Sequence, residues 1–188
     1  MRHPILKLLL VTTAVLLVTP FAQATTIQKL DLDQMVDRAG HVFRGTVLDV
    51  RTGSVEAGGA QLPTTTFVFR VEENFKGSYD KEHATVEITM LGSTKGGAAR
   101  VGDLQRVSAL PELPNLRIGS DYLMLTTPES RIGLSIPVGL GQGTFSIVLQ
   151  DRQELAVNAL DNANLGIGGS GPISYAELSA KIRALLGQ

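Results

Sequence analysis

The chain contains no cysteine, no tryptophan and only three histidines among its 188 residues. The lack of cysteine excludes a thiol nucleophile, a disulfide and the acylated cysteine of a lipoprotein, so an exported form must be held together by its hydrophobic core. Aromatic residues make up 5% of the sequence, which leaves few stacking platforms for sugars. The formal net charge is −1 and the charges are interspersed, without the basic cluster that nucleic-acid binding requires.

Patterns typical of catalysis or of a metal site are also missing. A zinc site needs three or four ligands, whereas His41 and His83 stand alone at the starts of two expected strands. Surface or structural roles are therefore predicted for both histidines. We predict no catalytic residue, no cofactor and no metal ligand, and an enzyme is the least favoured class.

Two loop motifs look like ligand sites but are more simply explained as connections. Residues 166–171 match the glycine spacing of a dinucleotide-binding loop, but no strand leads into them and Pro172 follows. Asp161, Asn162 and Asn164 place oxygen ligands in an expected loop, at a spacing that differs from that of an EF-hand. Calcium binding there stays an alternative to a plain loop.

The N-terminus has the layout of a secretory leader. Basic Arg2 and Lys7 precede the apolar run 8–18, and the small residues Ala22 and Ala24 form a signal-peptidase site. The apolar run is shorter than the roughly 20 residues that cross a bilayer. We expect a cleaved signal peptide at 1–24 and a single mature domain at 25–188, located in the periplasm or outside the cell and not integral to the membrane.

Alternating β-branched and aromatic residues predict a mainly β fold. The clearest strand covers residues 61–75, and Gly77 ends it. Gly45 indicates a bulge or bend in the first strand, and the glycine-rich segment 52–60 is expected to be a loop. A hairpin is expected to turn at residues 151–152. Further strands are expected at residues 41–51, 83–91, 121–127, 132–138, 144–150 and 154–158.

A helix is expected near each end of the mature chain. Asp31 with Gln34 forms a capping box for the first helix, and Ser174 with Glu177 forms one for a C-terminal helix at 174–186. Together the elements predict a small barrel or sandwich of about five to seven antiparallel strands, with one short N-terminal and one C-terminal helix.

The glycine-rich stretch 92–102 is the most flexible-looking segment of the sequence. Long loops on a rigid barrel often carry binding sites, although a plain surface loop is the simpler alternative. With the expected mature N-terminus, this stretch supplies the candidate partner-binding residues. They are Thr25, Thr26, Lys95, Gly96, Gly97 and Arg100.

A series of short motifs occurs in a familiar order. The motifs lie at residues 43–47, 66–71, 75–77, 96–97, 119–125 and 141–145. In this order they resemble a group of exported bacterial proteins of uncharacterised function, and the resemblance implies an OB-like barrel similar to netrin-like and TIMP-like domains. TIMP-like inhibitors bind a protease zinc through an N-terminal cysteine. The expected first residue here is Thr25, so no inhibitory residue is carried over.

The leading hypothesis is a non-enzymatic, exported protein-interaction module, in its specific form a regulator of a secreted metalloprotease. The alternative is a structural component of the envelope or of an extracellular assembly, which would self-associate through exposed edge strands such as those of the hairpin 144–158. A binder of small ligands or glycans on the barrel face is a third hypothesis.

Overall fold

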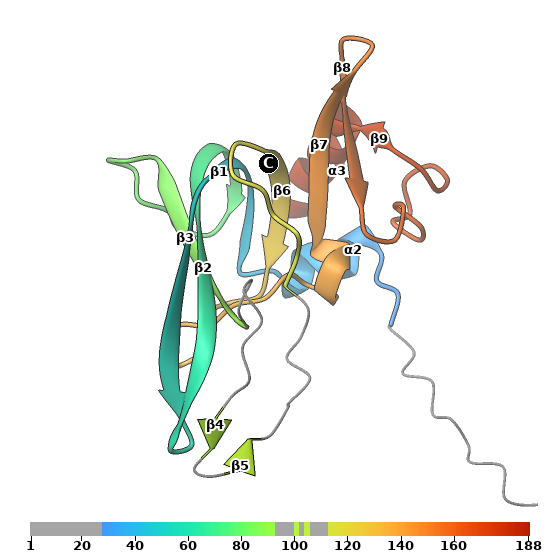
Figure 1. Ribbon diagram of the computed structural model, residues 1–188. Helices are drawn as coiled ribbons and strands as arrows, with labels where there is room; N and C mark the ends of the chain where they lie inside the picture. Colours follow the sequence, from blue (N-terminus) through green and yellow to red (C-terminus); the bar gives the residue numbers. More distant parts are fainter. Residues whose placement is uncertain (1–27, 93–99, 102–103, 106–112) are drawn as a thin grey trace, which may run out of the picture.

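The computed structural model describes residues 28–92, 100–101, 104–105 and 113–188 (Figure 1). The expected signal peptide lies outside these residues. The helices are α2 (Leu32–Arg38), the 3-10 helix η1 (Leu140–Gly143) and α3 (Tyr175–Leu186). The strands are β1 (His41–Ala57), β2 (Ala60–Lys76), β3 (Thr85–Leu91), β4 (Arg100–Val101), β5 (Leu104–Gln105), β6 (Asp121–Thr126), β7 (Thr144–Gln150), β8 (Gln153–Asn158) and β9 (Ile173–Ser174).

All strands belong to one antiparallel sheet, so the predicted mainly β class is confirmed. The strand order is β5-β4-β2-β1-β6-β7-β8-β9, and β3 pairs with β2 from Thr64 to Arg70. Among the described residues the sheet has nine strands, and three of them, β4, β5 and β9, contain only two residues each. The two long strands β1 and β2 therefore form the centre around which the others are arranged.

The predicted barrel closure is wrong, because the sheet stays open. The nearest approach to closure is at a seam between β3 and residues 134–138. There the Ser135 N–H donates to the Thr89 carbonyl at 2.8 Å, and Thr126 of β6 forms an isolated bridge with Pro137. Proline has no N–H to add to a ladder, and residues 131–133 turn instead of extending. The strand expected at 132–138 consequently does not form.

The loop expected at 52–60 is also wrong, because β1 continues to Ala57 and returns as β2. Gly58 and Gly59 have φ angles of +60° and +76°, which suit a two-residue hairpin turn. From Asp49 onward the register between the two strands is regular. We call residues 49–64 the arm, and Figure 1 shows it projecting from the body of the protein.

The first half of β1 is bent rather than flat. Register shifts occur between Val42 and Phe43, Arg44 and Gly45, and Val47 and Asp49. The predicted irregularity at Gly45 is thus confirmed. A Cβ at this position would lie 2.5 Å from the Arg70 carbonyl oxygen, so only glycine allows the two strands to approach this closely.

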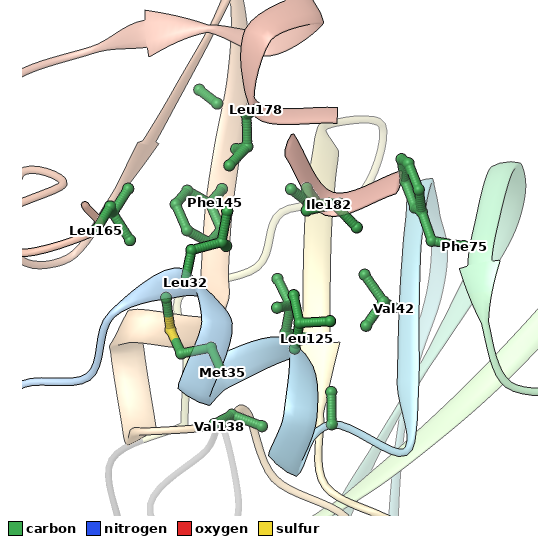
Figure 2. Close-up of a cluster of buried hydrophobic side chains, with 14 of the residues drawn as sticks. Leu32, Met35, Val42, Phe75, Leu125, Val138, Phe145, Leu165, Leu178 and Ile182 are labelled. Carbon is green, nitrogen blue, oxygen red and sulfur yellow. The ribbon is translucent and has the colours of Figure 1, made fainter. Parts of the chain in front are cut away.

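Two hydrophobic cores lie on opposite faces of the central strands. The first lies between the sheet and the helices, and Figure 2 shows Leu32, Met35, Leu125, Phe145 and Ile182 converging there. The second lies on the other face. Its largest fully buried members are Phe43, Phe67, Phe69, Ile88, Met90 and Met124. The successive residues Val42 and Phe43 of β1 contribute to opposite cores, so this part of the strand is covered on both faces.

The expected helix ends are confirmed in part. Asp31 and Gln34 form the predicted capping box of α2. Ser174 makes no side-chain capping bond to α3, because it belongs to β9 and pairs with Leu155. The second capping box is therefore wrong. The hairpin between β7 and β8 turns at Asp151 and Arg152 as expected, and both residues have positive φ angles.

Candidate functional site

The residues predicted for partner binding lie largely beyond the described parts of the chain. Thr25, Thr26, Lys95, Gly96 and Gly97 belong to the segments that the structure leaves out. The backbone of Arg100 is described, in β4, where it pairs with Gln61 and with Gln105. Partner binding by these residues stays a prediction.

An apolar pocket opens at the seam where β3 approaches the chain that follows β6. It encloses about 60 Å³, several times the 10–15 Å³ that one water needs. It is large enough for part of an apolar side chain and has no charged wall. Its lining residues are Met90, Leu91, Leu113, Pro114, Ile136, Pro137, Leu140 and Gly141.

Leu140 stands at the lip of this seam pocket in an unfavourable backbone conformation. Its φ angle is +61°, in the left-handed region that costs a non-glycine residue about 1–2 kcal/mol. Its side chain does not recover this energy by burial, since the residue is 49% exposed. Strain of this kind persists only where the surroundings impose it, and it is often found at binding sites.

The buried side chain of Gln142 imposes this conformation. Its amide nitrogen donates to the Gly139 carbonyl at 3.0 Å and to the Gln28 carbonyl at 2.9 Å, and its amide oxygen accepts from the Leu30 N–H at 2.9 Å. The Gly143 N–H donates to the Val138 carbonyl at 2.8 Å and closes the turn. These hydrogen bonds tie the turn that carries the lip to the rest of the fold.

The outer edge of β3 offers backbone groups beside the pocket. The Thr89 carbonyl faces the seam, where it accepts from Ser135, whereas the Gly92 N–H faces β2, where it donates to Pro63. Because backbone groups alternate sides along a strand, Leu91 turns its N–H and carbonyl to the same side as Thr89. Within the described chain, no backbone partner of Leu91 is found on this side.

A second polar feature, centred on Arg44, was missed by the sequence analysis. We call Arg44, Glu72, Asp121, Glu154 and Tyr175 the Arg44 cluster. The guanidinium donates to Glu154 at 2.6 and 2.7 Å and to Asp121 at 3.1 Å, its Nε lies 3.4 Å from Glu72, and its carbon lies 4.6 Å from the centre of the Tyr175 ring. The cluster connects β1, β2, β6, β8 and α3.

The electrostatics of this cluster indicate a structural role. Hydrogen bonds from Arg44 hold the pKa of Glu154 below its usual value. Burial acts to raise the pKa of Asp121, but hydrogen bonds from Thr46 and Arg44 outweigh it, and that pKa is also lowered. Burial raises the pKa of Tyr175. At neutral pH Asp121 and Glu154 stay ionised and the Tyr175 phenol stays protonated, so none of these three groups is poised for proton transfer.

The loop proposed as an alternative calcium site is organised by its own side chains. Asn162 is fully buried, and its amide donates to the carbonyls of Ala156 and Gly171 and accepts from the Asn158 N–H. Its oxygen is thus already occupied by the fold. In the described parts of the chain, no three residues of the types His, Cys, Asp and Glu are grouped to hold a metal ion.

Of the helices that the structure describes, none combines the length and the apolar character needed to cross a membrane. No protein-family model matches the sequence, and no curated protein matches it either.

Proposed function

We propose that this protein is an exported protein-interaction module whose seam pocket holds an apolar side chain of a partner protein. The observation that carries the proposal is the strained, half-exposed Leu140 at the lip of an apolar pocket. If Leu140 served only the fold, the protein would be more stable with this side chain buried or with glycine at this position. Its position is explained if the side chain contacts a ligand.

The character of the pocket favours a polypeptide as the ligand. Its walls are aliphatic and proline side chains, with Ile136 40% exposed at the rim, and they provide no charge to select an ion or a phosphate. Beside it, Leu91 presents a backbone N–H and carbonyl. Peptides that add to a strand edge combine such main-chain bonds with one side chain in a pocket, and the same arrangement is the expected mode here.

A partner pull-down tests this proposal. The exported protein serves as bait in periplasmic and secreted fractions of its own organism, with cross-linking and mass spectrometry as the readout. Leu140→Asn is the informative variant, because asparagine tolerates the left-handed conformation while removing the apolar side chain. Leu149→Asn is the matched control, because Leu149 is 75% exposed and lies at the β7–β8 hairpin, outside the pocket lining.

We expect a partner that is captured by the wild type and by Leu149→Asn and is lost with Leu140→Asn. Capture of a secreted protease in this pattern would identify the regulatory form of the function. Equal capture by both variants would overturn the pocket as the binding site. A urea titration that shows Leu140→Asn to be as stable as the wild type separates loss of binding from loss of folding.

A further inference from the structure

The arm has one edge whose backbone is open over most of its length. On one side β1 pairs with β2 as far as Ala57, whereas its pairing with β6 ends at Thr46. The turn at Gly119 and Ser120 bonds to Val47, and from Asp49 to Ala57 none of the described strands occupies this side. The second strand of the arm, β2, pairs with β3 and β4 along its edge away from β1.

The pairing shows which backbone groups face outward. Ser54 stands opposite Pro63, which has no N–H, so this pair does not exchange hydrogen bonds and Ser54 turns its own N–H and carbonyl away from β2. Because backbone groups alternate sides along a strand, Thr52 and Glu56 also turn their N–H and carbonyl away from β2, whereas those of Gly53 point toward β2. Outward-facing donors and acceptors therefore run along the open edge at Thr52, Ser54 and Glu56, whereas the outward Val50 N–H already donates to the Asp49 carboxylate at 2.8 Å.

We infer that two copies of this chain associate by antiparallel pairing of their β1 edges, across a two-fold axis at Gly53. Gly53 is the central residue of the stretch 49–57, so this register pairs the whole stretch with its copy. Thr52 then pairs with Ser54 of the second copy, and Val50 pairs with Glu56. No two like charges stand opposite each other, and two glycines meet where the strands approach most closely.

Exposed apolar residues at the base of the arm, which we call its root, are a second reason to expect that a copy of the same chain binds there. Leu48 and Ile118 are 43% and 63% exposed, and both adjoin the point where Val47 bonds to Gly119 and Ser120. In the register centred on Gly53, the tip of the second arm lies opposite Leu48. Each tip thereby covers exposed apolar surface at the root of the other arm, as an isologous interface requires.

Disulfide trapping tests this register directly, because the chain has no cysteine of its own. Two Gly53 residues in a non-hydrogen-bonded pair place their Cα atoms about 4.5 Å apart, within the range of a disulfide. A Cβ at Gly53 meets only Thr64 Oγ1, at 3.2 Å, so Gly53→Cys is tolerated after a small shift. Thr52→Cys is the control, because in this register its two copies lie about 8–9 Å apart.

Mild oxidation should give a covalent dimer of Gly53→Cys and little of Thr52→Cys. Sedimentation of the cysteine-free protein should show a concentration-dependent dimer, and Ser54→Pro should raise its dissociation constant about tenfold or more, because two symmetry-related N–H donors are lost. Ser54→Ala keeps the N–H and should leave the dimer unchanged. A wild type that stays monomeric at high concentration, or equal trapping of both cysteine variants, would overturn the inference. The seam pocket plays no part in this test, so its result is independent of the proposed function.

Discussion

Arg44 and Glu154 are joined by two parallel hydrogen bonds, from Nη1 to Oε2 at 2.7 Å and from Nη2 to Oε1 at 2.6 Å. The pair connects β1 with β8, although β6 and β7 lie between them in the sheet. The Arg44 side chain is only 13% exposed. This planar, two-point contact therefore holds the β7–β8 hairpin against the centre of the sheet.

Arg44→Met should destabilise the fold strongly. The substitution leaves the partly exposed carboxylates of Glu72, Asp121 and Glu154 close together without their central cation. Losing hydrogen bonds between charged groups in this way should cost about 1.5–3 kcal/mol of the free energy of unfolding. Urea denaturation at neutral pH measures the loss. Arg51→Met is the control, because Arg51 pairs with two carboxylates in an exposed setting, and it should change stability little. Equal effects of the two variants would contradict the structural role of the Arg44 cluster.

The Arg44 cluster makes the free energy of unfolding depend on pH in the acidic range. Since the pKa values of Asp121 and Glu154 are lowered in the folded protein, the unfolded chain binds more protons at low pH. Stability from these groups is present above their unfolded pKa values, near 4, and is lost as the pH falls through the folded values. Urea midpoints measured between neutral pH and pH of about 3 should fall. In Arg44→Met protonation relieves repulsion instead, so its deficit against the wild type should shrink in acid.

Gly45→Ala should disrupt the bend in β1. Its new Cβ would meet the Arg70 carbonyl oxygen at 2.5 Å, and this contact is with the backbone, which cannot move aside cheaply. A loss of about 2 kcal/mol or more is expected, as for other overpacked sites. Gly169→Ala is the matched control, because a Cβ there meets nothing within 4 Å. Thermal unfolding of the two variants distinguishes a required glycine from an incidental one.

Substitutions of the two asparagines in the 161–164 loop should have different effects on the free energy of unfolding. Asn162→Ala leaves the Ala156 and Gly171 carbonyls and the Asn158 N–H without their buried partners, which should cost about 2–4 kcal/mol. Asn164 has a φ of +70° and is exposed, so Asn164→Gly should be neutral or slightly stabilising. Calcium addition should not rescue Asn162→Ala. Rescue by calcium would revive the metal alternative for this loop.

The elements that could be predicted from the sequence are those in which local pattern and final environment agree. The capping box of Asp31 in α2 depends only on neighbouring residues, so it is the same in an isolated helix and in the folded protein. Gly45 indicates the irregularity of β1 because it lacks a side chain. The arm could not be predicted, because its local composition resembles that of a loop. A Gly58-Gly59 pair terminates a strand equally well at a two-residue turn or within a longer connection, and only the pairing with β2 decides between them.

The candidate site could not have been predicted in the same way. The seam pocket is assembled from four separate stretches of the chain, and each of them looks like an ordinary apolar or turn segment. The left-handed φ of Leu140 depends on Gln142, whose partners at Gln28 and Leu30 lie far away in the sequence. The glycines on either side of Leu140, Gly139 and Gly141, are the local sequence signal of a tight turn at this position.

The hydrogen bonds of Gln142 also have a mechanical consequence. They fasten Gln28 and Leu30, at the start of the described fold, to the same turn that carries Leu140. When the chain is pulled from its N-terminal side, the load reaches this turn before it reaches the interior of the sheet. Tension at that end of the chain would therefore deform the lip of the seam pocket first, while the long β1–β2 ladder, loaded later, stays intact.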